Sequence, residues 1–177
     1  MPRHLAELCL SQRMGEIVYS LTRVEGKMQD VETQLRNPQL IRGAALKEEL
    51  VGGRVKGVEG EGVAITKVNY FKGNDRSKWK ANISTYDLVS LGEVYKGVEI
   101  KLRAYGNKVE KLFYINPGAR AESIRVKLSG GRLNINKDGE LEISTELGAV
   151  RFSKPIAYQE SGGKEEAGSG GVCGRGG

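Results

Sequence analysis

The sequence predicts a mainly β protein, an antiparallel β-sandwich or open barrel of about eight short strands with little helix. Short segments rich in β-branched and aromatic residues are separated by glycine, proline and asparagine at intervals of about 8–12 residues. Two pairs of these segments also fit hairpin registers. The chain has 177 residues, 38% of them hydrophobic, which suffices for one domain with a core. We therefore expect a poorly patterned N-terminus (1–14), a single β domain (15–160) and a glycine-rich disordered tail (161–177).

The first part of the β domain is less clearly patterned than the rest. Residues 5–9 place apolar side chains at helical spacing and predict a short helix in the N-terminus. Residues 15–21 are β-branched and aromatic and predict the first strand. The polar stretch 24–45 predicts a linker, because it contains the helix-breaking pair Asn-Pro, and residues 28–35 within it could form a helix. Residues 46–51 predict a strand, and the glycine-spaced residues 52–62 predict a loop.

The middle of the chain predicts two strands joined by a helical turn. Residues 63–71 predict one strand and 83–91 the next, with a connector at 94–97. Between the two strands, Asp75 is a suitable N-cap for one turn, since its carboxylate can accept hydrogen bonds from backbone N–H groups. Trp79 follows this turn, and we expect it to pack on the protein rather than to contact a ligand.

The most strongly specified element is the hairpin formed by residues 98–105 and 108–115. Gly106-Asn107 suits a two-residue turn, which fixes the register between the strands. In that register the aliphatic residues share one face, and Arg103 lies opposite Glu110 on the other. A slip of one residue would move every side chain to the wrong face, so we predict this register firmly.

The last part of the chain predicts a turn at 116–119, a strand at 123–128 and a second hairpin. The hairpin joins 133–136 to 140–144, and its apolar residues face one another only if the loop has three residues with Gly139 in the left-handed conformation. A final strand is expected over 145–156, after a turn at Leu147-Gly148, with Phe152 opposite Ile143 and Pro155 at an edge.

The charge distribution suggests one candidate ligand face. Residues 67–128 contain 13 Lys and Arg but only 6 Asp and Glu, so they carry the whole surplus behind the net charge of +6. Lys101, Arg103, Tyr105 and Tyr114 share the outward face of the first hairpin and form a candidate surface for polysaccharide or another polyanion. The alternative is an ordinary solvated face with cross-strand packing, since the lysines alternate with apolar residues rather than cluster. We do not expect nucleic-acid binding.

No residue pattern indicates catalysis, a cofactor or a metal. The single histidine, His4, lies in the unpatterned N-terminus, and Cys9 and Cys173 are near opposite ends, so no nucleophile–base pair or zinc site is predicted. No phosphate-binding glycine motif follows a strand. The chain contains no apolar run of the roughly 18 residues that span a membrane and no secretion signal. We expect the protein not to be an enzyme.

An ordered series of motifs resembles a known family. The series runs VNYFKGNDRSKWKANISTYDLV, VYKGVEIKLRAYGNKVEKLFYINPGA and ELEISTELGAVRFSKPIAYQE, within residues 62–160, the best-defined part of the domain. It resembles the uncharacterised β-rich domain, a domain of unknown function, at the N-terminus of large bacterial and archaeal proteins with SBBP-type β-propeller repeats. The matching positions are Asn69, Tyr70, Phe71, Gly73, Asp75, Trp79, Asn82, Tyr86, Val94, Tyr95, Gly97, Tyr105, Gly106, Pro117, Gly118, Ala119, Lys154, Pro155, Tyr158, Gln159 and Glu160.

The resemblance implies a structural or adhesion-type module of an exported or cell-surface repeat protein, and it supplies no catalytic residues. Such domains carry a secretion signal and further strands that this chain lacks, so we expect a fragment truncated at both ends. A fragment with open strand edges is expected to bind the rest of its parent protein or to self-associate. The resemblance places the protein outside the cell or in the envelope, whereas the chain expressed as given would stay in the cytoplasm. A polysaccharide- or polyanion-binding module is the alternative function.

Overall fold

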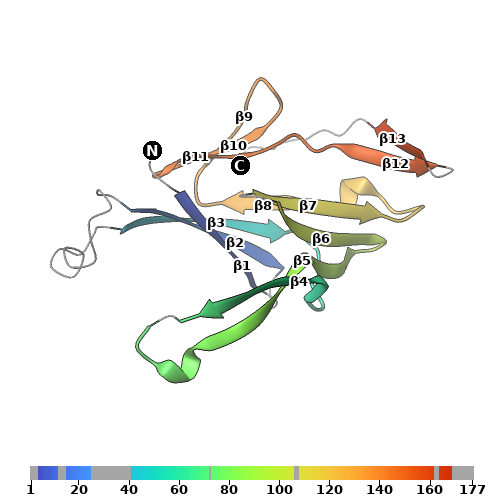
Figure 1. Cartoon of the computed structure of the whole chain (residues 1–177). Coiled ribbons are helices and arrows are strands. Elements are labelled where there is room, and N and C mark those ends of the chain that lie inside the picture. Colours follow the sequence, from blue (N-terminus) through green and yellow to red (C-terminus); the bar gives the residue numbers. More distant parts are fainter. Residues whose placement is uncertain are drawn as a thin grey trace. The chain divides into compact units, whose positions relative to one another are not determined.

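The protein is mainly β, as the sequence predicts, but its described residues form thirteen strands instead of about eight. The computed structural model describes residues 4–11, 15–24, 41–71, 73–105, 108–161 and 164–168. Within these residues lie thirteen strands and two single 3₁₀ turns, Arg76–Lys78 and Ala121–Ser123 (Figure 1). The strands are β1 (His4–Ser11), β2 (Glu16–Val24), β3 (Ile41–Leu50), β4 (Glu59–Tyr70), β5 (Lys80–Tyr95), β6 (Val98–Tyr105), β7 (Lys108–Ile115), β8 (Val126–Ser129), β9 (Arg132–Ile135), β10 (Leu141–Thr145), β11 (Gly148–Phe152), β12 (Ala157–Ser161) and β13 (Lys164–Gly168).

The chain divides into two compact units. Unit 1 contains residues 1–9, 17–48 and 128–177, and unit 2 contains residues 10–16 and 49–127. The strands form four sheets with the orders β1-β2-β3-β8, β4-β5-β6-β7, β11-β10-β9 and β12-β13. Every strand pair whose register is resolved is antiparallel.

Unit 2 is built on the sheet β4-β5-β6-β7. On β6 the alternate residues Val98, Ile100 and Leu102 are buried, as period-2 alternation of a half-buried strand requires. Val98 and Ile100 belong to a core cluster that also contains Leu50 and residues from the end of β5, with further side chains packed against it. The hydrophobic residues of the cluster are Leu50, Leu91, Val94, Tyr95, Val98 and Ile100, against which Val55, Val58, Val89, Phe113, Ala119 and Ile124 pack.

The predicted register of the β6–β7 hairpin is confirmed along its whole length. Val98 pairs with Ile115, Ile100 with Phe113 and Tyr105 with Lys108, which leaves a two-residue loop. The loop itself, Gly106-Asn107, lies outside the described residues, so its turn type stays a prediction. Burial falls toward the loop, where Val109 is exposed although it lies on the apolar face.

β5 is longer than predicted. The sequence predicts a strand over 83–91 and a connector at 94–97, but one strand runs through all of Lys80–Tyr95 and only Lys96-Gly97 turns. Gly92 adopts a positive φ of 67° within the strand, where the pairing with β6 shifts register. A glycine bulge of this kind bends a strand without ending it.

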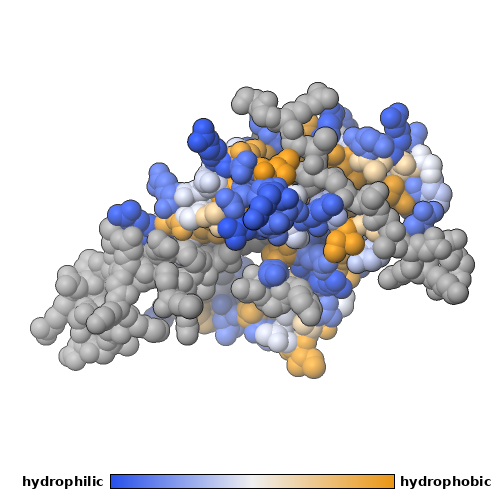
Figure 2. All heavy atoms as spheres, turned by 90° about the horizontal axis from the view of Figure 1, so that it is seen from above, coloured by the Kyte–Doolittle hydropathy of each residue, from blue (hydrophilic) through white to orange (hydrophobic). Residues whose placement is uncertain are grey.

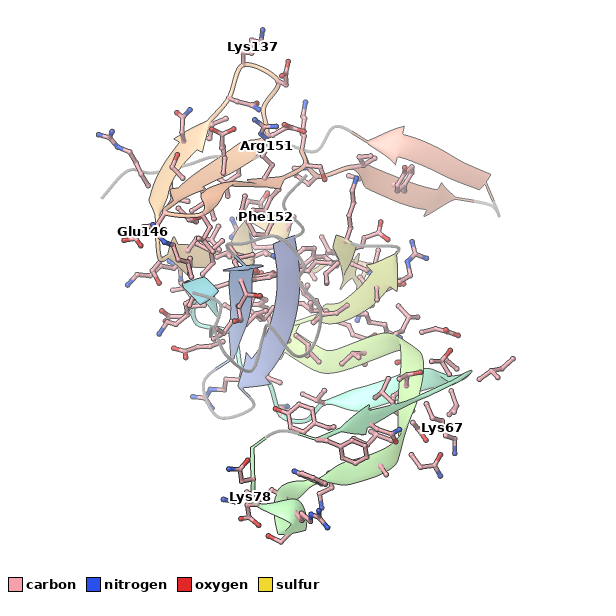
Figure 3. The ribbon with its side chains drawn as sticks, turned by 60° about the vertical axis from the view of Figure 1, so that its left-hand side comes forward. Lys67, Lys78, Lys137, Glu146, Arg151 and Phe152 are labelled. Atoms are coloured by element: carbon pink, nitrogen blue, oxygen red, sulfur yellow. The ribbon has the colours of Figure 1, made fainter. Side chains whose placement is uncertain are left out.

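Unit 1 has its own buried residues. Ile17 on β2, Leu46 on β3 and Ile143 on β10 are each almost fully buried. Glu48 is also fully buried, and it accepts a hydrogen bond of 2.7 Å from the hydroxyl of Tyr19. The ring of Tyr19 meets Phe152 edge to face with centroids 5.8 Å apart, and Figure 3 shows Phe152 on β11. A buried carboxylate with a donor is therefore part of this core.

The backbones in unit 1 approach closely at Gly130 and Gly131. A Cβ on Gly130 would collide with the carbonyl oxygen of Ala45, and Gly130 also has a positive φ of 108°. A Cβ on Gly131 would lie 2.5 Å from the carbonyl oxygen of Ser144. The glycine pair that marks a strand end in the sequence thus also permits chain segments to pack without side chains between them.

The β9–β10 hairpin confirms the predicted three-residue loop. Ile135 pairs with Leu141 and Leu133 with Ile143, and Gly139 has the expected positive φ of 78°. The side-chain oxygen of Asn136 accepts hydrogen bonds from the backbone N–H groups of Asp138 and Glu140, which closes the loop. Figure 3 shows Lys137 at its tip.

The predicted register of the next hairpin is wrong. Ile143 pairs with Val150, and Phe152 pairs with Leu141 instead. The turn is at Glu146-Leu147 rather than Leu147-Gly148, because the hydroxyl of Thr145 accepts a hydrogen bond from the N–H of Leu147 and donates one to the carbonyl of Gly148. β11 also ends at Phe152 instead of continuing to Ile156.

The two ends of the chain differ from the prediction. The N-terminus forms strand β1 rather than a short helix, because pairing with β2 prevails over a helical period of only a few residues. The segment predicted as a disordered tail contains β13, which pairs with β12 through Tyr158–Ala167 and Glu160–Glu165. Most of the predicted linker 24–45 lies outside the described residues, and its last residues belong to β3.

Candidate functional site

Lys101, the central residue of the predicted ligand face, is already surrounded by carboxylates. Its ammonium nitrogen lies 2.9 Å from both carboxylate oxygens of Glu61 and 3.4 Å from Glu99. It also lies 5.5 Å from the ring centroid of Tyr114, a cation–π contact. The hydrogen bond to Glu61 is the main cause that raises the pKa of Lys101, with partial desolvation opposing it. Its positive charge is therefore neutralised within the protein.

Arg103 on the same face is also paired. Its guanidinium donates two hydrogen bonds to Glu110, the residue directly opposite on β7, at 3.0 and 2.5 Å. The side chain of Tyr105 lies outside the described residues. The structure thus brings Lys101 and Tyr114 together as predicted, but it leaves neither Lys101 nor Arg103 without a carboxylate partner.

Unit 2 has a second candidate site, an open depression of about 700 Å³. Three segments that are distant in the sequence line it: the loop that follows β3, the β5–β6 turn with the residues before it, and the loop that follows β7. We call this feature the basic depression. Its lining residues include Arg54, Lys56, Glu93, Lys96, Pro117 and Arg120.

Backbone contacts hold the three segments of the basic depression together. The N–H of Arg54 donates to the carbonyl of Val94 at 2.9 Å, and the N–H of Asn116 donates to the carbonyl of Gly97 at 2.9 Å. Gly97 has a positive φ of 73°, and a Cβ there would lie 2.8 Å from the Cβ of Ala119. The depression is therefore a preformed feature of the fold.

Several residues that carry the family resemblance belong to the segments that form the basic depression. Tyr95 is buried and its hydroxyl donates to the carbonyl of Arg125 at 2.9 Å. Gly97 and Ala119 make the close approach just described, and Gly118 adopts a positive φ of 83° in the turn after β7. These motif residues have structural roles. Their roles account for the spacing of the motif, and no bound ligand is needed to explain it.

The cations of the basic depression are candidate functional residues that the sequence analysis missed. Four basic residues line it, Arg54, Lys56, Lys96 and Arg120, against one acidic residue, Glu93. They are scattered over 67 positions of the chain, so no run of charge marks them. One signal in the sequence could have indicated them. Lys96 and Arg120 each lie close to a glycine turn, and these two turns become neighbouring loops when β5 pairs with β6 and β6 with β7.

A third feature is apolar. The outer part of the β4–β5 hairpin, residues 63–86, holds seven of the fifteen large hydrophobic side chains that are exposed in the described part of the chain. We call it the β4–β5 arm, and Figure 3 shows Lys67 and Lys78 on it. Figure 2 shows hydrophobic side chains exposed among hydrophilic ones on the face that it presents. The seven are Val63, Ile65, Val68, Tyr70, Phe71, Ile83 and Tyr86.

The first motif stretch, VNYFKGNDRSKWKANISTYDLV, closes the tip of the β4–β5 arm. Asp75 caps the 3₁₀ turn as predicted, accepting hydrogen bonds from the backbone N–H and the hydroxyl of Ser77 at 3.1 and 2.6 Å. These bonds lower the pKa of Asp75, with Ser77 the main cause and Lys78 adding to it. The indole N–H of Trp79 donates to the carbonyl of Gly73 at 3.0 Å, and its ring packs against Phe71. These motif residues therefore build a turn.

The described residues offer no arrangement of three or more His, Cys, Asp or Glu side chains suited to a metal ion. Among the same residues, no helix is both long and apolar enough to cross a membrane. The side chains of His4 and Cys9 and the whole of Cys173 lie outside the description.

Comparison with known proteins gives a family. A family described as "Domain of unknown function (DUF7948)" matches residues 5–169. The chain belongs to this family. The match extends the DUF7948 domain from β1 to the end of β13, well beyond the residues 62–160 in which the motifs are clearest. No curated protein and no solved structure matches the chain.

Proposed function

We propose that the chain is a non-catalytic structural β module that assembles with a second copy of itself through the β4–β5 arm. The observation that carries this proposal is the cluster of exposed apolar side chains on the arm, where Ile65 is fully exposed, Val63 is 69% exposed and Phe71 is 58% exposed. Apolar patches of this kind on a folded domain mark contact surfaces, because leaving them in water is unfavourable.

The position of the arm in its sheet supports an intermolecular contact. β4 is an edge strand of twelve residues, so one side of its backbone has no neighbouring strand among the residues that the structure describes. Its pairing with β5 shifts register between Val63 and Lys67, which places Ile65 in a bulge. Long apolar edge strands attract other chains, and natural proteins normally cover or charge them.

The charge order along β4 favours a second copy as the partner. The acidic residues Glu59 and Glu61 lie at its start, and its only basic residue, Lys67, lies near its end. Two β4 strands placed antiparallel about a twofold axis near Val63 bring Glu59 of each opposite Lys67 of the other, while Glu61 keeps its pair with Lys101. The apolar residues between them then meet in the centre, which is the self-complementarity that a symmetric dimer needs.

The oligomeric state tests this proposal. We expect the protein to form dimers at micromolar concentrations, and Ile65→Ser to raise the dimer dissociation constant at least about tenfold by removing a central apolar contact. Ile156→Ser removes an equally large side chain, 72% exposed, from outside the arm and is the matched control. Light scattering after size exclusion over a range of concentrations measures both. A monomer at every concentration, or equal effects of the two variants, would refute the proposal.

The context of the module is also a proposal. The motif series from residue 62 to 160 resembles the N-terminal domain of exported or cell-surface proteins with SBBP-type propeller repeats, and we propose that this chain comes from such a protein. Sequencing the surrounding gene tests it: an in-frame secretion signal and repeats are expected, and a gene that encodes neither would contradict the assignment.

The alternative function, polyanion binding on the face formed by Lys101, Arg103, Tyr105 and Tyr114, has less support. Lys101 and Arg103, the two cations of this face, are already hydrogen-bonded to Glu61 and Glu110. A ligand would have to displace these carboxylates, which opposes binding.

A further inference from the structure

The basic depression holds cations that the protein does not neutralise. Arg54, Lys56 and Lys96 form no ion pair with any of the described residues. Arg120 has only a contact of 3.8 Å with Glu122, and both side chains are about four-fifths exposed, so solvent screens that pair. Glu93 is the single carboxylate in the lining. The depression therefore carries a surplus of three positive charges.

Several other cations of the described surface are paired with carboxylates. Lys78 pairs with Asp75, Lys101 with Glu61 and Arg151 with Glu142, the last at 2.8 Å. Positive charges that converge on a concave surface concentrate the electrostatic field and attract anions more strongly than the same charges spread over a convex one. The segments that carry them are held by backbone hydrogen bonds, so little conformational entropy is lost when an anion binds.

We propose that the basic depression binds an acidic polysaccharide, whose sulfate or carboxylate groups contact Arg54, Lys56, Lys96 and Arg120. The lining also includes Val94 and Pro117, apolar groups against which the C–H faces of sugar rings can pack. The depression is open, which suits a chain that passes through it better than a small ligand that must be enclosed.

Nucleic acid fits the same depression less well. Proteins that bind single strands stack the bases on exposed aromatic side chains. Tyr95 is the only aromatic residue in the lining, it is 8% exposed, and its hydroxyl is bonded to the carbonyl of Arg125. The depression thus offers positive charge but no aromatic surface on which bases could stack. This favours a polyanion, such as an acidic polysaccharide, that binds without base stacking. This site goes beyond the proposed self-assembly and uses different residues.

Matched charge-removal variants test the site. Lys56→Gln/Lys96→Gln removes two cations from the depression, and Lys127→Gln/Lys137→Gln removes two exposed lysines that do not line it. Binding of the full chain is measured by calorimetry at several salt concentrations, with heparin as the sulfated probe and polygalacturonate as the carboxylated probe. Uncharged dextran is the negative control.

We expect the depression variant to lose at least about tenfold in affinity for one or both acidic probes, with a salt slope lower by about two, whereas the control variant loses less than about threefold. Circular dichroism of each variant reports whether the fold is kept. Absence of binding, or equal losses in both variants, would overturn the site. Tighter binding of single-stranded DNA than of either polysaccharide, lost in the same variant, would overturn the ligand class.

Discussion

At the residue scale, the Tyr19–Glu48 contact in unit 1 joins a fully buried carboxyl group to a partly buried hydroxyl. Glu48 is fully buried, and Tyr19 donates its hydroxyl proton to it at 2.7 Å. Burial is the main cause that raises the pKa of Tyr19 far above its ordinary value, and the nearby carboxylate of Glu48 adds to the shift. Tyr19 therefore stays neutral in the folded protein when an exposed tyrosine has begun to ionise.

We expect Tyr19→Phe to lower the free energy of unfolding at pH 7 by about 1.5–3 kcal/mol, since it removes a hydrogen bond to a charged group. The raised pKa sets the pH dependence. Its contribution is fully present below pH ~10, where tyrosine in the unfolded chain is neutral, and is lost as the pH rises above that value. The difference between wild type and Tyr19→Phe should therefore shrink above pH 10.

Urea unfolding from pH 7 to pH 11 measures this difference. Tyr158→Phe, which changes a side chain that is 62% exposed, is the control and should follow wild type throughout. A gap between wild type and Tyr19→Phe that stays constant over the whole range would show that Tyr19 ionises equally in the folded and unfolded states.

At the element scale, the β6–β7 hairpin shows how much of the fold the sequence determines locally. Its register follows from a two-residue loop and a face of aliphatic side chains, and every pair is as predicted. The β9–β10 hairpin was equally predictable because its apolar residues match in only one loop length. The β10–β11 hairpin was not, since Thr145 fixes the turn through side-chain hydrogen bonds that apolar pairing does not reveal.

Two substitutions in the β6–β7 hairpin separate packing from charge. Ile100 is fully buried in the core of unit 2, and we expect Ile100→Ala to lower the free energy of unfolding by about 2–5 kcal/mol through a cavity. Glu110→Gln removes the partner of Arg103, but both side chains are 47% exposed, so the loss should be under about 1 kcal/mol. Chemical denaturation measures both.

The charge contribution in that hairpin must also depend on salt. The small effect of Glu110→Gln should disappear at about 1 M salt, where charges are screened within a few ångströms, whereas the effect of Ile100→Ala should remain. If Glu110→Gln lowered the free energy of unfolding by several kcal/mol, the Arg103–Glu110 pair would be needed to fix the strand register.

At the scale of the whole molecule, the sequence predicts the β class but not the division of the chain. The chain crosses from one unit to the other four times, within β1, β2, β3 and β8. The sequence at these four boundaries does not have the composition of a linker. The pairing of β3 with β8 joins residues about 80 positions apart, and no local pattern specifies such a pair. The basic depression was missed for the same reason, because its cations come together only when loops distant in the sequence meet.

The division nevertheless predicts which part of the chain folds alone. Every member of the principal core cluster lies between Leu50 and Ile124, within the continuous segment 49–127 of unit 2. That segment also contains all four strands of the sheet β4-β5-β6-β7. Unit 1, by contrast, takes its buried residues Ile17, Leu46 and Ile143 from segments separated by unit 2 in the sequence.

We therefore expect the isolated fragment 49–127 to show a β-sheet circular dichroism spectrum and a cooperative thermal transition, since its 79 residues are within the size range of domains that fold alone. The fragment 128–177 should show neither, because it lacks β2 and β3, which supply the buried residues Ile17 and Leu46 of unit 1. Ile100→Ala within 49–127 is the control for a native core: it should abolish or strongly lower the transition. A transition unaffected by Ile100→Ala would mean that the fragment collapses without the native packing, and an unfolded fragment 49–127 would mean that its core needs residues outside the segment.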